Sequence, residues 1–331
     1  MHHGTVITPP ERQFDAVAEG SAVMSTQPNY ENPWEEAQNN RSYWYHTMAF
    51  PDGETIRGSW TIEDFDQYIG GYDLSGKTVL DIGTASGFLA FSAEKRGAQV
   101  TGLDAASIDE FRHVPFSDSL SYKDIRQFKD VWTRDNLIPI KNSWWHAWAK
   151  NNSKAKCVYA PMPELYEWPE QMFDVVMAGA IVEHLSEPVF AIGAWARLAR
   201  EAVLIPFTDV IPVDDLIMRP ITPLDNSKIN YVWWHLSRGL YNKIFNNLGF
   251  DVHYTLAQAE HHDDVNGSTI AKRPSIIAVR RGTEAHRTFK VDPSLTFTMP
   301  EPEPAVQVPQ DTPARRPWWQ RRGSSSGSGS H

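Results

Sequence analysis

Short apolar runs alternate with amphipathic segments through most of this 331-residue chain. The runs predict seven strands, at 77–83, 98–104, 157–162, 173–180, 201–207, in the second half of 240–256 and at 274–281. Helical patterns lie between them, most clearly at 88–96, at 188–200 and in the first half of 240–256. Near-continuous Val, Ile and Leu runs are typical of strands that are buried on both faces. The alternation therefore predicts an α/β fold with a doubly wound, seven-stranded, mostly parallel sheet.

No helical pattern separates the last two predicted strands, so we expect them to pair antiparallel at one side of the sheet. The sheet would then carry an antiparallel edge strand. Before the first strand, the aromatic stretch "SYWYHTMAF" begins at Ser42 and predicts an N-terminal cap on the sheet.

Composition divides the chain into three parts. Residues 1–40 are polar and without period, which indicates a mobile N-terminal arm, and residues 41–282 hold the predicted domain. Within that domain the stretch 105–156 is long for a single crossover, so we expect a lid-like insertion. Residues 283–331 are rich in Pro, Ser and Gly and read as a disordered tail, in which "ARRPWWQRR" could alternatively dock on RNA or a membrane surface.

The formal net charge is −10, which is poorly suited to nucleic acid, because Lys and Arg contacts to phosphate carry most of that affinity. The single cysteine, Cys157, allows no intrachain disulfide and is compatible with a reducing compartment. The longest apolar run, 175–182, is too short to cross a bilayer. We therefore expect a cytoplasmic protein without membrane contact, and no pattern indicates an oligomeric state.

The stretch "DIGTASGF", residues 81–88, follows the first predicted strand, where doubly wound sheets bind their ligands. Its glycines, Gly83 and Gly87, do not have the G-x-G-x-x-G spacing of dinucleotide sites. The carboxylate of Asp81 would repel a pyrophosphate and attract an ammonium group. Asp104 ends the next strand, where a carboxylate can accept both hydroxyls of a ribose. S-adenosylmethionine combines a ribose with an amino-acid end and has no phosphate.

The loop "DIGTASGFLAF", together with "GLD" at the next strand end, resembles the class I S-adenosylmethionine-dependent methyltransferases. "SYWYHTMAFPDGETIRGSW", "FDVVMAGAIVEHLSEP" and "YVWWHLSRGLYNKIFNNLGF" are similar to the subgroup related to the tRNA wobble-uridine carboxymethyltransferases, and the likeness covers about 42–281. The alternative is a dehydrogenase or a non-catalytic Rossmann-like domain. The resemblance implies S-adenosylmethionine as the cofactor, bound by Asp81, Gly83, Thr84, Ala85, Gly87, Asp104, Ala105 and Met162, with Trp44 and His46 from the cap.

One departure from the subgroup concerns the residue after the fourth-strand histidine. The subgroup has an arginine there, which holds the carboxylate of a carboxylated cofactor, whereas Leu185 follows His184 in this chain. This difference favours ordinary S-adenosylmethionine. Together with the acidic charge it favours a small-molecule or glycan acceptor, methylated at oxygen by in-line transfer. The alternatives are an RNA (tRNA) methyltransferase and a non-catalytic cofactor-binding partner subunit.

Three residues are candidates for the base that takes the acceptor's proton. Glu183 and His184 follow the fourth predicted strand, and adjacent side chains on an extended chain point to opposite faces, so we do not expect a dyad. Histidine has an ordinary pKa near neutrality, which favours His184, and His235 is its rival.

Aromatic faces suit rings and sulfonium groups, which nominates four substrate-binding residues, Tyr45, Trp145, Trp233 and Trp234. Core packing is an equal expectation for Trp233 and Trp234, and it is favoured for the helix that carries Trp145.

The segment 253–268 contains several potential metal ligands. Their spacing matches no defined ligand pattern, so we expect a polar hairpin and no metal site. The residues concerned are His253, His261, His262, Asp263 and Asp264.

Overall fold

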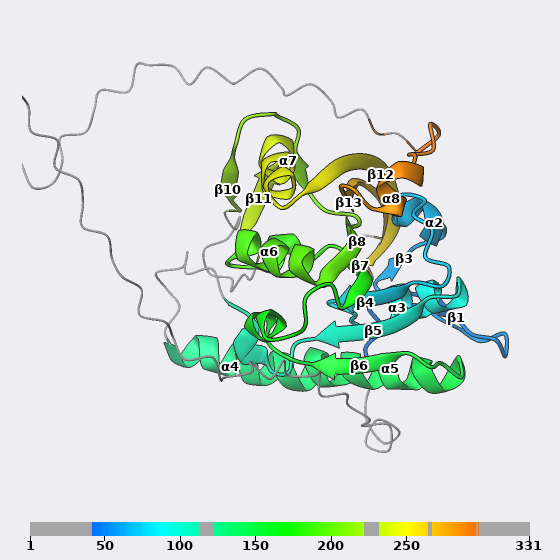
Figure 1. Cartoon of the computed structure of the whole chain (residues 1–331). Coiled ribbons are helices and arrows are strands. Elements are labelled where there is room, and N and C mark those ends of the chain that lie inside the picture. The colour runs from blue at the N-terminus through cyan, green and yellow to red at the C-terminus, as the bar shows by residue number, and fades with distance from the viewer. Residues whose placement is uncertain (1–41, 113–121, 222–231, 264–266, 296, 298–331) are drawn as a thin grey trace, which may run out of the picture. The chain divides into compact units, whose positions relative to one another are not determined.

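One central sheet of eight strands organises the chain (Figure 1). The computed structural model describes residues 42–112, 122–221, 232–263, 267–295 and 297, all within the compact unit Met1–Met299. The strands lie in the order β3 (Trp60–Thr61), β12 (Phe250–Asp263), β13 (Gly267–Arg280), β8 (Ala199–Ile205), β7 (Phe173–Met177), β4 (Thr78–Ile82), β5 (Gln99–Asp104) and β6 (Lys156–Tyr159).

The five strands from β6 to β8 are all parallel, as predicted. The chain moves outward from β4 to β5 and β6, then returns to the other side of β4 with β7 and β8. This reversal places the topological switch point between β4 and β7, where open α/β sheets form a crevice at the carboxyl ends of their strands. The predicted α/β, doubly wound, mostly parallel sheet is confirmed.

The strand count and the edge differ from the prediction. The sheet has eight strands instead of seven, and the antiparallel strand β13 lies inside the sheet, between β8 and β12. The edge strand is β3, which pairs antiparallel with β12 through Thr61 and Trp60. Sequence pattern missed β3 because two residues are too few to show a period.

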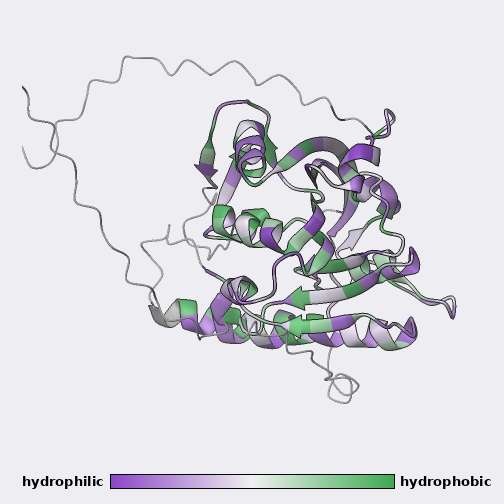
Figure 2. Cartoon of the chain, viewed as in Figure 1, coloured by the Kyte–Doolittle hydropathy of each residue, from purple (hydrophilic) through white to green (hydrophobic). Residues whose placement is uncertain are grey.

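Helices cover both faces of the sheet. Neighbouring residues of a strand belong to different core clusters: Val79 faces the cluster with α3 (Phe88–Lys95) and α5 (Ile138–Lys150), and Leu80 faces the one with α6 (Pro188–Leu198) and α7 (Arg238–Asn247). Because both faces are buried, these strands need apolar side chains at consecutive positions. Figure 2 shows this hydrophobic character along the strands, and mixed positions along α5 and α6.

The crossover from β5 to β6 includes a single long helical stretch that runs beside β6 (Figure 1). It consists of α4 (Tyr122–Trp132), a π-helical turn, η2 (Thr133–Leu137), and α5. The lid-like role predicted for 105–156 remains a proposal. Within this stretch, residues 113–121 lie outside the described part of the chain.

Smaller elements complete the described structure. They are the β1 (Met48–Ala49) and β2 (Thr55–Ile56) pair, the three-stranded sheet of β9 (Val210–Ile211), β10 (Met218–Pro220) and β11 (Trp234–Ser237), the short helices α2 (Phe65–Tyr68) and α8 (Glu284–Thr288), and the 3₁₀ helices η1 (Ile108–Glu110), η3 (Met162–Tyr166) and η4 (Val182–His184). None of the helices in the described ranges combines the length and apolar composition that crossing a membrane requires.

The domain extends past the predicted boundary at residue 282. Helix α8 follows it directly, and the His286 ring lies 2.7 Å from a carboxylate oxygen of Asp251 on β12. The predicted N-terminal arm, 1–40, and the "ARRPWWQRR" segment lie outside the described residues.

The histidines of the β12–β13 hairpin have structural partners. The His262 ring lies 2.7 Å from the Thr61 hydroxyl and 2.8 Å from the Ser268 hydroxyl, and the His261 ring packs against Trp60. These contacts attach the hairpin to β3. Asp264 lies outside the described residues.

Trp144 on α5 connects the helical layer to the loop that follows β4. Its side chain is fully buried beside Phe91, and its indole N–H donates to the Thr84 hydroxyl at 3.1 Å. When a buried hydrogen bond is removed, water cannot reach the group that remains to replace the bond.

We expect Trp144→Phe to lower the free energy of unfolding by about 1–3 kcal/mol, from the lost bond and the lost volume. Urea denaturation measures this change. Trp148→Phe is the matched control: its indole N–H also donates, to the Ala155 carbonyl, but the residue is only half-buried and should lose less. An equal loss in both variants would contradict a special role for the buried bond to Thr84.

Candidate cofactor and acceptor site

The loop from Gly83 to Gly87 lies at the switch point and joins β4 to α3. Gly83 and Gly87 have φ angles of +70° and +90°, which side chains rarely adopt. A Cβ on Gly83 would stand 2.7 Å from Ile181 Cδ1, and one on Gly87 would stand 2.3 Å from the Phe91 ring. The loop therefore depends on glycine at both positions.

Asp104 ties this loop to the end of β5. Its two carboxylate oxygens accept hydrogen bonds from the backbone N–H groups of Ala85 and Ala105, each at 2.8 Å. Burial raises the pKa of Asp104 above its ordinary value, although both backbone bonds and Lys141 act in the opposite direction. Each oxygen keeps further acceptor capacity for a ligand.

Two cavities meet at Asp104. Cavity 1 has a volume of about 450 Å³ and cavity 2 of about 340 Å³. Both lie at the carboxyl ends of β4, β5 and β7, where the fold predicts a ligand. They share five lining residues, Gly83, Asp104, Phe111, Ile181 and His184.

Cavity 2 has an acidic lining. It includes four carboxylates, and Arg112 is the one Lys or Arg side chain that the described residues contribute. Such a lining disfavours a pyrophosphate and accepts hydroxyl and amine donors. Ala105 and Met162, which the resemblance assigns to the cofactor, both line this cavity. The carboxylates belong to Asp104, Asp109, Glu110 and Glu187.

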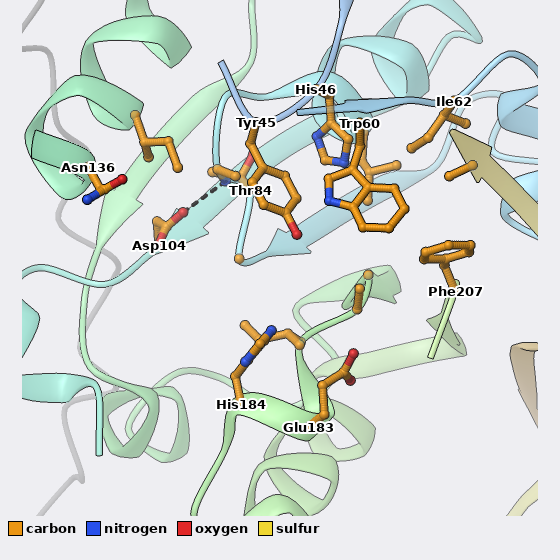
Figure 3. Close-up of a pocket in the computed structure, with 18 of the residues that line it drawn as sticks. Tyr45, His46, Trp60, Ile62, Thr84, Asp104, Asn136, Glu183, His184 and Phe207 are labelled. Atoms are coloured by element: carbon orange, nitrogen blue, oxygen red, sulfur yellow. Dashed lines mark hydrogen bonds between the residues drawn. The ribbon is translucent and has the colours of Figure 1, made fainter. Parts of the chain in front are cut away.

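Rings and aliphatic side chains make up most of the lining of cavity 1. Figure 3 shows Tyr45, His46 and Trp60 on one side, and Glu183 and His184 across the space from them. His46 is nearly fully buried, its Nδ1 has no hydrogen-bond partner among the described residues, and burial lowers its pKa to about 3. The imidazole is therefore neutral near pH 7. Rings line this cavity from Tyr43, Tyr45, His46, Trp60, Tyr68, Phe111, Trp132 and Phe207.

The charged groups of cavity 1 form a chain at one end. The Arg273 guanidinium lies 3.7 Å from a carboxylate oxygen of Glu183 and 3.4 Å from one of Asp209. His235 Nε2 lies 3.6 Å from the same Asp209 oxygen. Burial alone would raise the pKa of Asp209, but His235 and Arg273 outweigh it and leave the pKa below its ordinary value.

The structure brings most of the predicted site residues to the two cavities. Cap residues, the glycine loop and the segment after β7 meet there although they are far apart in sequence. The predicted residues that line a cavity are Tyr45, His46, Gly83, Thr84, Ala85, Asp104, Ala105, Met162, Glu183 and His184.

Seven predicted residues line neither cavity in the described part of the chain, and four of them are tryptophans whose side chains have other partners. Trp145 donates to the Tyr159 hydroxyl, Trp233 to the Arg112 carbonyl and Trp234 to the Ser186 carbonyl. Trp44 packs against Phe50 and His146. The seven residues are Trp44, Asp81, Gly87, Trp145, Trp233, Trp234 and His235.

Some lining residues escaped sequence reasoning. Arg273 and Phe207 come from strands, or strand ends, that showed only an apolar pattern. Asn136 lies in the π-helical turn, and such turns occur often at functional sites, but a single sequence gives no signal for them. Trp60 ends the aromatic segment 42–60, so its aromatic side chain was the one sequence feature that could have indicated a role in the site.

No family model matches this chain, and no curated protein matches it. Among solved structures, magnesium protoporphyrin IX methyltransferase from Synechocystis with bound S-adenosylhomocysteine is 16% identical, with a TM-score of 0.36 over 63% of this chain and 76% of its own. 1,6-didemethyltoxoflavin-N1-methyltransferase from Burkholderia thailandensis is 12% identical, with a TM-score of 0.34 over 62% of this chain and 72% of its own. An S-adenosylmethionine-dependent methyltransferase from Aquifex aeolicus is 15% identical, with a TM-score of 0.34 over 62% of this chain and 82% of its own. Likeness this low carries no argument about function.

Asp81 is a buried carboxyl behind the loop. It is 0% exposed, and burial raises its pKa to about 7, although Thr84 and the Ala90 backbone act in the opposite direction. The folded chain thus holds a proton that the unfolded chain, with a pKa near 4, has lost. Between about pH 4 and pH 7 this difference makes the free energy of unfolding fall as pH rises.

We therefore expect the difference in free energy of unfolding between Asp81→Asn and the wild type to depend on pH. The variant should be favoured more at about pH 8 than at about pH 5, by a few kcal/mol at most. Urea unfolding at both pH values measures the difference. Asp174→Asn is the control, since Thr78 and Arg200 outweigh burial and lower the pKa of Asp174. That carboxyl is ionised at both pH values in the folded and in the unfolded chain, so the effect of its replacement should be the same at about pH 5 and at about pH 8. A pH-independent effect of Asp81→Asn would contradict the buried, protonated carboxyl.

Proposed function

We propose that this protein is a class I S-adenosylmethionine-dependent methyltransferase that acts on a small-molecule acceptor. The observation that carries the proposal is Asp104, a hydrogen-bonded carboxylate at the junction of an acid-lined cavity and a ring-lined cavity. A ribose diol suits this carboxylate, and the acidic lining suits a nucleoside without phosphate.

The described residues fit the cofactor as follows. Asp104 would accept the ribose hydroxyls, and Ala105 and Met162 would contact the adenine in cavity 2. The amino-acid end would lie toward Thr84, Ala85 and His46 in cavity 1. Asp81, which lies behind the loop, would support it without touching the ligand. Leu185 lines cavity 2 where the wobble-uridine subgroup has an arginine, which favours ordinary S-adenosylmethionine over a carboxylated form.

S-adenosylmethionine supplies a methyl group that its sulfonium has already activated. The protein then has to align the acceptor and exclude water from it. Residues at the mouth of both cavities, such as Ile181 and Phe111, would provide apolar cover. His184 lines both cavities, so it would stand near the transferred group.

We assign different roles to the three candidate bases. In Figure 3 the side chains of Glu183 and His184 reach toward the cavity from the same side, and both residues line cavity 1. His235 lines neither described cavity and reaches cavity 1 only through Asp209. A role of His235 would therefore be one of positioning.

Binding of S-adenosylmethionine tests the proposal directly. We expect Asp104→Asn to weaken its binding about tenfold or more, equivalent to roughly 1.5–3 kcal/mol, because a charge-assisted bond is lost. Isothermal titration calorimetry measures the affinity, and circular dichroism confirms that the variant is folded. NADH should not bind to the wild type.

Glu187→Gln provides the matched control. Glu187 also lines cavity 2, but it is exposed, so the affinity should stay within about twofold. Unchanged affinity in Asp104→Asn, or binding of NADH, would remove the cofactor assignment.

The reaction itself needs a separate measurement. A metabolite extract incubated with the protein and methyl-labelled S-adenosylmethionine should yield a labelled small molecule in mass spectrometry. Tight cofactor binding with no labelled product from any extract would instead support a non-catalytic cofactor-binding subunit.

A further inference from the structure

We propose that the acceptor is a planar aromatic compound with a hydroxyl or amine donor, which binds in cavity 1 with its donor on Glu183. This inference rests on the proposed methyl transfer and names its substrate class. Three independent features carry it: the arrangement of the rings, the placement of polar groups, and the charge at one end of the cavity.

Several of the rings that line cavity 1 pack against one another. The Trp60 and Phe207 rings meet edge to face, with centroids 5.5 Å apart, and Tyr68 stacks on Phe207 at 5.6 Å. These residues come from β3, α2 and the end of β8, so three separate elements hold the same group. In Figure 3 Trp60 and Tyr45 face the space that Glu183 enters from the opposite side. Rings fixed in this way present apolar faces and edges to a flat guest.

The polar groups of the cavity favour an aromatic guest over a glycan. A sugar carries hydroxyls around its whole ring, and each needs a partner when it leaves water. Apart from Asp104 at the junction with cavity 2, the Asp, Glu, Lys and Arg side chains that line cavity 1 are Glu183, Asp209 and Arg273, which lie together, while rings and aliphatic side chains dominate the rest of its lining. A molecule with one polar edge and an otherwise apolar ring matches this distribution.

The charge at that end favours a donor. Arg273 faces two carboxylates, those of Glu183 and Asp209, so the group carries one negative charge in excess. Its guanidinium also lies over the Phe207 ring, with 5.0 Å between the guanidinium carbon and the ring centroid. Arg273 is thus already engaged, and a ring that bears a carboxylate would meet net repulsion.

Glu183 is placed to receive the donor. It is 6% exposed and lines cavity 1, and one oxygen accepts from the Thr208 hydroxyl at 3.3 Å. With a phenol bound there, Glu183 would take the proton that the acceptor oxygen loses while the oxygen–methyl bond forms. The methyl–sulfur bond breaks at the same time and leaves its electron pair on sulfur. An aromatic amine loses its proton in the same way.

Calorimetric titration of the full chain with four probes tests the proposal. We expect 2-naphthol to bind at least about tenfold more tightly than 2-naphthoate, which replaces the donor with an anion. The affinity for 2-naphthol should also exceed, by a similar factor, the affinity for decahydro-2-naphthol, which lacks the flat ring, and that for methyl glucoside. Glu183→Gln should remove most of the preference for naphthol over naphthoate, whereas Glu170→Gln, an exposed glutamate that lines neither described cavity, should retain it.

Equal or tighter binding of 2-naphthoate, the decahydro compound or the glucoside would overturn the inference. Because these comparisons use the wild type, they decide the question even if Glu183→Gln fails to fold. A parallel titration with S-adenosylmethionine distinguishes a failure of the substrate class from a failure of the proposed function. If the cofactor binds and the ring preference is absent, only the substrate class fails; if the cofactor does not bind, the proposed function fails.

Discussion

The pair of hydrogen bonds that Asp104 accepts from the backbone of Ala85 and Ala105 is the interaction on which the site depends. A partly buried carboxylate is stabilised by such donors, because burial disfavours its charged form. By taking one N–H from the glycine loop and one from its own strand end, Asp104 fixes the loop relative to β5. Both cavities then open on either side of a single charged group.

The loop is supported from the other side by the long helical stretch between β5 and β6. Trp144 on α5 holds Thr84, while Asn136 and Leu137 of the preceding π-helical turn line cavity 1. One stretch thus contributes to the core and to the site. A π-helical turn changes which side chains face the sheet without ending the helix, and here it lies where the core gives way to the cavity.

The two cavities have opposite characters, and each follows from its neighbours. Cavity 2 lies among strand ends and short helices that carry carboxylates, and it suits a ligand rich in donors. Cavity 1 lies between the N-terminal aromatic segment and the ends of β7 and β8, and rings and aliphatic side chains make up most of its lining. Under the proposed function, this division separates a place for a nucleoside from a place for an acceptor, with His184 in the lining of both.

The amino-acid sequence determined the parallel strands β4 to β8, the glycine loop and the acid at the end of β5. Each of these depends on neighbouring residues: apolar runs, turn-forming glycines and a carboxylate at a strand end. The sequence did not determine that β13 inserts between β8 and β12, or that Trp60 forms an edge strand, because strand order is set by long-range pairing. For the same reason only the tertiary structure placed Arg273 beside Glu183 and Phe207 beside Trp60. It also paired the indole N–H groups of Trp145, Trp233 and Trp234 with protein oxygens, of Tyr159, Arg112 and Ser186 respectively. Aromatic residues pack equally well in a core or around a ligand, and only the fold decides which side of a helix or strand faces the cavity.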